Sequence, residues 1–242
     1  LNHHTSGVRM EWYRDDLEKA KKEGNIQRWQ LPSDESPYQF RDKSQKLNIS
    51  QQFPPQLSIY PEDVLHDFKC LSERVRLVSA QQKLKIIGIC SPAPGQGRST
   101  VASAIALLLA MREKAVLSTP NENALLLNKI RGTSREILLF DTNVKNPSLY
   151  NKLQISTKFG LTELLLDEVP LQDGICPVRH SHLQFLGAGY MKHFQFVQSH
   201  FDSMAAFLEM VNAHFEYVFI DIPPLLHSPE GMAIAKLCDS LI

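Results

Sequence analysis

The loop CSPAPGQGRST, residues 90–100, constrains the fold most, because it joins a short apolar run, KIIGI, to a run typical of a buried helix, VASAIALLLA. Gly95 and Gly97 allow the backbone to approach a bound anion, so that several N–H groups can point at it. The N-terminus of the helix that begins near Ser99 adds its dipole. This strand–loop–helix order predicts a phosphate-binding loop, and a purely structural glycine turn is the alternative.

The loop departs at two positions from the pattern G-x-x-x-x-G-K-[ST], because Pro92 replaces the first glycine and Arg98 replaces the lysine. Arginine keeps the positive charge but carries a larger, planar group, so the exchange is not conservative. The loop by itself is therefore weak evidence for a nucleotide site.

The rest of the chain alternates short apolar runs with helical patterns, which predicts an α/β fold. Strands are expected over residues 85–90, 136–141, 183–188 and 216–224, with the beginning of another near the chain end at 238–242. Helices are expected over residues 62–78, 99–113, 121–130, 160–168 and 201–215. Such alternation is typical of a mostly parallel sheet with helices on both faces, a three-layer α/β/α arrangement.

Two domains are expected. Residues 1–57 contain one helical pattern, around 10–24, and a polar segment punctuated by prolines, which predicts a tail and linker without a core. Residues 58–242 form the α/β domain, and we expect it to be truncated at its C-terminus, since the chain stops inside the last strand pattern.

The composition limits the partners. The 26 basic and 26 acidic side chains balance, which argues against nucleic acid as the main partner. Four cysteines without a CxxC pair favour a reducing cytoplasm. The longest apolar run, VASAIALLLAM, is far shorter than the roughly 20 residues of a membrane-spanning helix.

Two expected strands end in an acidic residue, Asp141 in ILLFDTNVKNP and Asp221 in YVFIDIPP. A carboxylate at the end of a strand beside a phosphate loop is a common holder of Mg²⁺ or its waters. One such aspartate is often only a turn residue or a helix cap. Two of them beside a glycine loop favour a nucleotide site.

The set SPAPGQGRST, ILLFDTNVKNPSLY and FEYVFIDIPPLL resembles the bacterial tyrosine kinases of capsule and exopolysaccharide biosynthesis, members of the deviant P-loop ATPases. The resemblance covers roughly residues 58–242 and implies a P-loop NTPase fold with ATP and Mg²⁺ as cofactors. It further implies phosphorylation of tyrosines on other copies of the chain. A membrane-bound polysaccharide chain-length or adaptor protein is the implied partner, which places the chain at the inner face of the plasma membrane.

The resemblance also implies roles for single residues. Arg98 falls on the family's phosphate-bridging lysine, and Asp141 on the group that accepts or aligns the tyrosine proton; these two are the expected catalytic residues. Ser99, Asp221 and Asn143 fall on the metal-holding positions. The nucleotide phosphates are expected to be held by Pro94, Gly95, Gln96, Gly97, Arg98, Ser99 and Thr100.

Several positions depart from the family pattern. Asn143 replaces the second carboxylate of D-x-D, and Lys145 replaces an arginine. The ring-forming E-x-x-R-x-x-R helix is broken by His66, Lys69 and Ser72, and the connector 112–135 is longer than the family's. These departures suggest weak or lost kinase activity. A catalytically degenerate nucleotide-sensing or docking module therefore stays open, as does a positioning ATPase of the partitioning type, although Ala93 stands where those ATPases carry a lysine.

Overall fold

The computed structural model describes residues 55–117, 136–166, 169–179, 181–190 and 194–242. The helices expected over 10–24 and 121–130 lie outside these residues. The division at residue 57 stays a prediction. The described fold begins with helix α2 (Pro55–Ser58), whose Leu57 is fully buried in the hydrophobic core.

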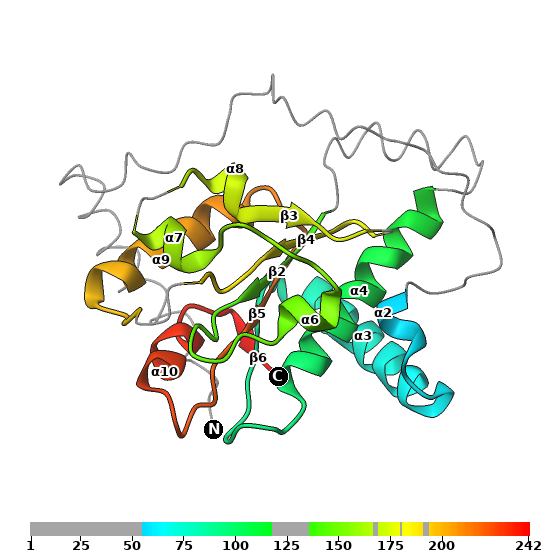
Figure 1. Cartoon of the computed structure of the whole chain (residues 1–242). Helices are drawn as coiled ribbons and strands as arrows, with labels where there is room; N and C mark the ends of the chain where they lie inside the picture. The colour runs from blue at the N-terminus through cyan, green and yellow to red at the C-terminus, as the bar shows by residue number, and fades with distance from the viewer. Residues whose placement is uncertain (1–54, 118–135, 167–168, 180, 191–193) are drawn as a thin grey trace.

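A six-stranded sheet forms the centre of the described structure, in the order β3-β4-β2-β5-β1-β6 (Figure 1). All neighbouring strands run parallel except β3, which pairs antiparallel with β4 at one edge. The strands are β1 (Ile86–Ile89), β2 (Ile137–Asp141), β3 (Ile175–Pro177), β4 (Leu183–Leu186), β5 (Tyr217–Asp221) and β6 (Ser240–Leu241). The predicted mostly parallel sheet is confirmed.

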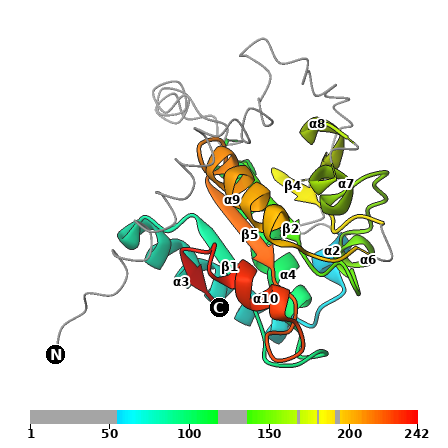
Figure 2. The ribbon, with the colours of Figure 1, turned by 90° about the vertical axis from the view of Figure 1, so that its left-hand side faces the viewer.

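The central strands are apolar at nearly every position because both faces of the sheet are covered. On one face Ile87, Leu139 and Phe219 share a core with α3 (Glu62–Gln82) and α4 (Arg98–Leu117). On the other face Leu138, Phe140 and Ile220 pack with side chains of α7 (Leu161–Leu165), α9 (Gln198–Asn212) and α10 (Pro229–Ala235). Figure 2 shows α9 and α10 in front of the strands and α4 behind them. The predicted three layers are confirmed.

The helices on the second face are α7 (Leu161–Leu165), α9 (Gln198–Asn212) and α10 (Pro229–Ala235). The helix expected over 160–168 is thus shorter than its sequence pattern. It begins after Gly160, whose N–H donates to the carboxylate of Glu163, 2.8 Å away. Leu166 follows as the C-cap. Leucine-rich runs fit a helix and a buried turn equally well, so the pattern overestimated the helix.

Four short elements were not predicted. They are α2, α6 (Leu149–Leu153), α8 (Leu171–Gly174) and strand β3. Elements of three to five residues are too short to show a period. Pro177, which has no N–H to donate, further disguises β3, although an edge strand tolerates it. Helix α10 was also missed, although its start is marked by Ser228, whose hydroxyl accepts from the N–H of Gly231, and by Pro229.

The topology brings the three sequence motifs to one edge of the sheet. The glycine loop leaves the carboxyl end of β1, and Asp141 and Asp221 end the neighbouring strands β2 and β5. In the register of the sheet Asp221 lies opposite both Asp141 and Ile89. Ligands of open α/β sheets bind at this edge. Within the described ranges, every helix is too short or too polar to serve as a membrane span.

Candidate phosphate-binding site

The glycine loop has the backbone that its two glycines allow. Gly95 and Gly97 have φ angles of +78° and +80°, in the region that L side chains rarely adopt. A Cβ added at either glycine would meet no atom within 4 Å, so the backbone angle and not space requires glycine there. Helix α4 begins directly after the loop, and the N–H of Val101 donates to the carbonyl of Gly97, 2.9 Å away.

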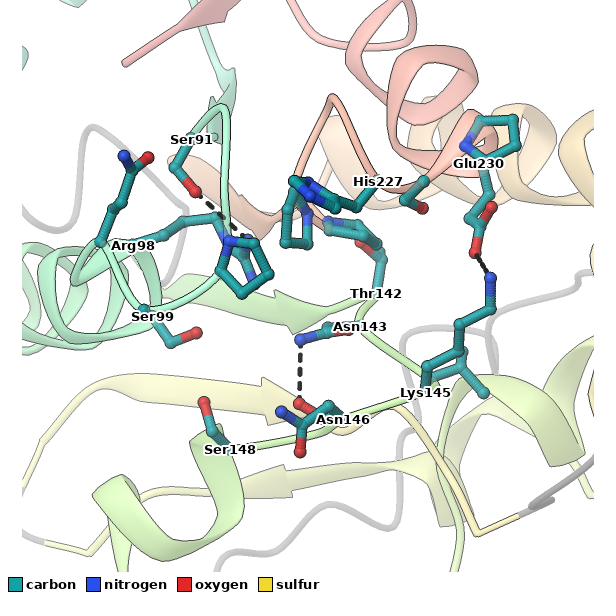
Figure 3. A pocket seen from close by; sticks show the side chains of 18 of the residues that line it. Ser91, Arg98, Ser99, Thr142, Asn143, Lys145, Asn146, Ser148, His227 and Glu230 are labelled. Atoms are coloured by element: carbon teal, nitrogen blue, oxygen red, sulfur yellow. Dashed lines mark hydrogen bonds and ion pairs between the residues drawn. The ribbon is translucent and has the colours of Figure 1, made fainter.

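A cavity of about 810 Å³ lies against this loop (Figure 3). One wall is the loop and the first turn of α4, and a second wall is the segment after β2, which includes Asn143, Lys145 and Asn146. The cavity is also lined by Lys152 of α6, by residues 223–224 and 227–230 after β5 and by Phe194, Phe196 and Phe201. Its size suits a drug-sized or nucleotide-sized ligand.

Polar contacts fix the segment that follows β2. The Asn143 side-chain amide donates to the carbonyl of Asn146 at 2.8 Å. The Lys145 ammonium lies 2.6 Å from a carboxylate oxygen of Glu230 in α10, and Figure 3 shows this ion pair across the cavity from the loop. On the opposite side Lys152 Nζ donates to the hydroxyl of Thr100 at 2.7 Å, which brings a second cation to the first turn of α4.

Arg98 does not extend away from the sheet. Its side chain is 7% exposed, and Nε lies 2.5 Å from Oδ1 of Asp221, whose side chain is 1% exposed. A longer contact of 3.5 Å joins Nη1 to the hydroxyl of Ser91 (Figure 3). The residue expected to neutralise phosphates is thus ion-paired with the residue expected to hold the metal.

Asp141 is fully buried. Its Oδ1 accepts from the N–H of Asn143 at 2.9 Å, whereas Oδ2 has no hydrogen-bond partner in the described structure. Burial, with the nearby charge of Asp221, raises the pKa of Asp141 to about 8. Burial also raises the pKa of Asp221, and Arg98 and the Ser99 hydroxyl oppose that rise. Asp141 is therefore largely protonated at neutral pH.

The structure divides the predicted site residues into two groups. All seven predicted loop residues, Pro94 to Thr100, line the cavity, and so does Asn143. Asp141 and Asp221 are fully buried and do not line it. Their roles as base and metal ligand stay predictions.

Sequence reasoning missed several lining residues. Lys152 follows the D-x-N motif at no fixed spacing, so nothing in the sequence marks it. The aromatic side chains lie in the segment FQFVQSHF, where Phe196 stacks on Phe201 with ring centroids 5.3 Å apart and Phe194 stacks on His200 at 4.8 Å. Phe194 and Phe196 lie just before the helix expected over 201–215, and these two aromatic residues were a visible signal that the helix pattern did not explain.

The residues present do not fit a Mg²⁺ ion at Asp221. Mg²⁺ requires oxygen ligands that face an open space and near-octahedral geometry. Here the Asp221 carboxylate is bound by Arg98, and its second oxygen is buried without a partner in the described structure.

No protein-family model matches the chain. The chain is 25% identical over 166 residues to the succinoglycan biosynthesis transport protein ExoP of Rhizobium meliloti. The aligned region covers 67% of this chain and 18% of ExoP. It is 20% identical over 177 residues to the tyrosine-protein kinase YwqD of Bacillus subtilis. The aligned region covers 72% of this chain and 65% of YwqD. The chain therefore spans less than two thirds of each of these relatives.

Solved structures share the fold. The kinase domain of the Escherichia coli tyrosine kinase ETK superposes with a TM-score of 0.59 at 18% identity, over 84% of this chain and 72% of that domain. The VpsO kinase domain superposes with a TM-score of 0.54 at 21% identity, over 72% of this chain and 75% of that domain. With the sequence matches at 20–25% identity, the chain is a distant relative of the bacterial tyrosine kinases of capsule and exopolysaccharide biosynthesis.

Proposed function

We propose that this chain is a nucleotide-binding regulatory protein of capsule or exopolysaccharide biosynthesis that transfers phosphoryl groups slowly or not at all. One observation carries the proposal: all seven residues expected to hold the phosphates line the cavity, while the two carboxylates that transfer would require are fully buried and do not line it. In this arrangement the loop is available to bind phosphates, whereas the carboxylates of Asp141 and Asp221 are not exposed to them.

The described residues supply what nucleotide binding requires. Backbone N–H groups of the loop and the N-terminus of α4 bind the phosphates. Lys152 adds a positive charge beside Thr100, 2.7 Å away. The phenylalanines at the cavity wall offer flat apolar faces to the base. ATP and ADP are the proposed ligands.

Phosphoryl transfer needs a group that accepts the proton of the attacking hydroxyl within hydrogen-bond reach. Burial raises the pKa of Asp141, which favours its protonated form, and its side chain is 0% exposed, so it serves poorly as that base in this arrangement. Arg98 is bound to Asp221, which removes the expected cation from the transferred phosphate. Losing one such electrostatic contact slows a reaction by about 10²–10³-fold.

Tyrosine kinase activity is the second candidate. Asp141 and Asp221 lie opposite one another in the register of β2 and β5, and this placement of two carboxylates behind the loop favours it. A shift of Arg98 toward bound phosphates would free Asp221. In that case the chain would phosphorylate tyrosines on other copies of itself.

The relatives' names suggest a setting for this function. One relative is a succinoglycan biosynthesis transport protein and others are tyrosine-protein kinases. We propose that the chain acts at the inner face of the plasma membrane, bound to a membrane-embedded polysaccharide chain-length protein. Co-purification from membranes, before and after removal of that protein, tests this assignment.

Calorimetric titration with ADP and ATP tests nucleotide binding. We expect micromolar affinity for the native chain and about tenfold weaker binding for Lys152→Ala, because a charge-assisted contact is lost. Lys158→Ala is the matched control, since Lys158 is exposed and lies outside the cavity lining. An absence of nucleotide binding by the native chain would contradict the proposal.

Mass spectrometry for phosphotyrosine after incubation with ATP separates the two candidates. The regulatory proposal predicts no phosphotyrosine beyond that of an Asp141→Asn variant. Phosphotyrosine that forms in the native chain and disappears in this variant would establish the kinase instead.

A further inference from the structure

The contact between Arg98 and Asp221 is the feature of the site that the nucleotide-binding proposal leaves unexplained. The two side chains are 7% and 1% exposed, and Nε and Oδ1 are 2.5 Å apart. A charged pair this deeply buried is retained only where each partner compensates the other. The pair therefore belongs to the interior of the site and is not a surface salt bridge.

The same carboxylate is the group that a divalent cation would need. Ser99 follows Arg98 in the first turn of α4, and its hydroxyl opposes the rise that burial causes in the pKa of Asp221. A serine hydroxyl with a strand-end aspartate is a donor set that suits Mg²⁺. In this chain the guanidinium already occupies one oxygen of that aspartate, and the other oxygen is buried without a partner in the described structure.

Displacing the guanidinium would be unfavourable. Among the described residues, removing the carboxylate would leave a buried positive charge with one remaining side-chain contact, the 3.5 Å one from Nη1 to the Ser91 hydroxyl. A lysine at this position, with a flexible stem and a compact charge, would extend toward bound phosphates more easily.

We propose that Arg98 takes the place of the divalent cation in this site. It neutralises Asp221 permanently, so the carboxylate does not bind Mg²⁺. Phosphates then bind to the loop, to α4 and to Lys152 without the metal. This second part rests on the proposed nucleotide binding, whereas the exclusion of the metal from Asp221 does not.

Binding of Mn²⁺, followed by electron paramagnetic resonance without nucleotide, tests the exclusion directly. The native chain and an Asp221→Asn variant should bind Mn²⁺ to the same extent, because Asp221 does not contribute to binding in the native chain. Arg98→Ala frees the carboxylate, so Mn²⁺ affinity should rise at least about tenfold, and the added Asp221→Asn change should abolish the gain. Arg98→Gln, which keeps a long polar side chain without the charge, should show the same rise if the alanine variant is unstable.

Arg76→Ala is the matched control. Arg76 is paired with Glu73 at 3.1 Å on the surface of α3, away from the cavity, so its removal should leave Mn²⁺ binding unchanged. Native binding of Mn²⁺ that depends on Asp221 would overturn the proposal. A failure of both Arg98 variants to gain Mn²⁺ would overturn it equally, since Arg98 would then not be what excludes the metal.

Calorimetry with ADP in Mg²⁺ and in EDTA tests the consequence for nucleotides. The native chain should bind ADP with affinities in Mg²⁺ and in EDTA that agree within about twofold. The Arg98→Lys variant should bind ADP at least about tenfold more tightly in Mg²⁺ than in EDTA. If the native chain binds ADP only with Mg²⁺, the metal inference is wrong while nucleotide binding stands. If ADP binds under neither condition, the proposed function fails, and the Mn²⁺ result decides the metal inference alone.

Discussion

At the scale of the residue, Arg98 and Asp141 show how surroundings change the chemistry that a motif predicts. The loop pattern predicts a cation at residue 98, and the cation is present, but it contacts a carboxylate 123 positions away in the chain. The motif predicts an ionised Asp141, yet burial raises the pKa of this residue to about 8. Both differences arise from neighbours that the local sequence does not contain.

The raised pKa of Asp141 predicts a pH-dependent stability. The folded protein keeps a proton on Asp141 up to about pH 8, whereas the unfolded chain releases it near its ordinary value of about 3.9. Because the folded state binds more protons in this window, the free energy of unfolding falls as pH rises through it. Asp141→Asn should remove the part of that fall that Asp141 causes, which is at most about 1.4 kcal/mol per pH unit; Asp221, whose pKa is also raised, keeps its own part.

Urea unfolding of the native chain and of Asp141→Asn, at several pH values between about 5 and about 8, measures how the free energy of unfolding of each depends on pH. Asp67→Asn, a change of an exposed aspartate on α3, should leave the native slope unchanged. Parallel stability curves for the native chain and Asp141→Asn would show that Asp141 titrates normally.

At the scale of the element, the beginning of β1 depends on a side chain from the far end of the chain. Oδ2 of Asp239 accepts from the N–H groups of Lys85 and Ile86, each at 2.8 Å. Asp239 lies between α10 and β6, and β6 pairs with β1. One carboxylate thus joins the start of the loop-bearing strand to the sheet edge.

Asp239→Ala should destabilise the protein by about 2–4 kcal/mol, because two partly buried N–H groups lose a charged acceptor. Urea denaturation measures the loss, and amide exchange should accelerate first in β1. Asp202→Ala is the control, since Asp202 accepts one hydrogen bond from Gln198 on the exposed side of α9. Equal effects of the two changes would contradict the role of Asp239.

At the scale of the whole molecule, two cores lie on opposite faces of one sheet, and the short helix α2 belongs to the first of them. Leu57 is 0% exposed, and the amide of Gln56 donates to the carbonyl of Leu153 in α6, 3.1 Å away. The polar, proline-containing segment before it gives no local sign of this packing. The domain therefore depends on residues that the sequence placed in the linker.

Leu57→Ala should lower the free energy of unfolding by about 2–5 kcal/mol, the usual cost of a cavity in a packed core. Leu226→Ala should change it by less than about 0.5 kcal/mol, because Leu226 is 78% exposed. Chemical denaturation of both variants measures the contrast. A negligible effect at Leu57 would place the start of the folded domain after this residue.

The sequence by itself determined the α/β class, the long helices, the central strands and the position of the glycine loop. These features follow from local periodicity and from turn chemistry, which neighbouring residues carry. The strand order, the antiparallel edge strand and the short helices were decided by tertiary structure, because their few residues are stabilised by contacts distant in sequence. The same holds for the site: the loop residues were predictable, whereas the Arg98–Asp221 pair, the burial of Asp141 and the place of Lys152 depend on segments that only folding brings together.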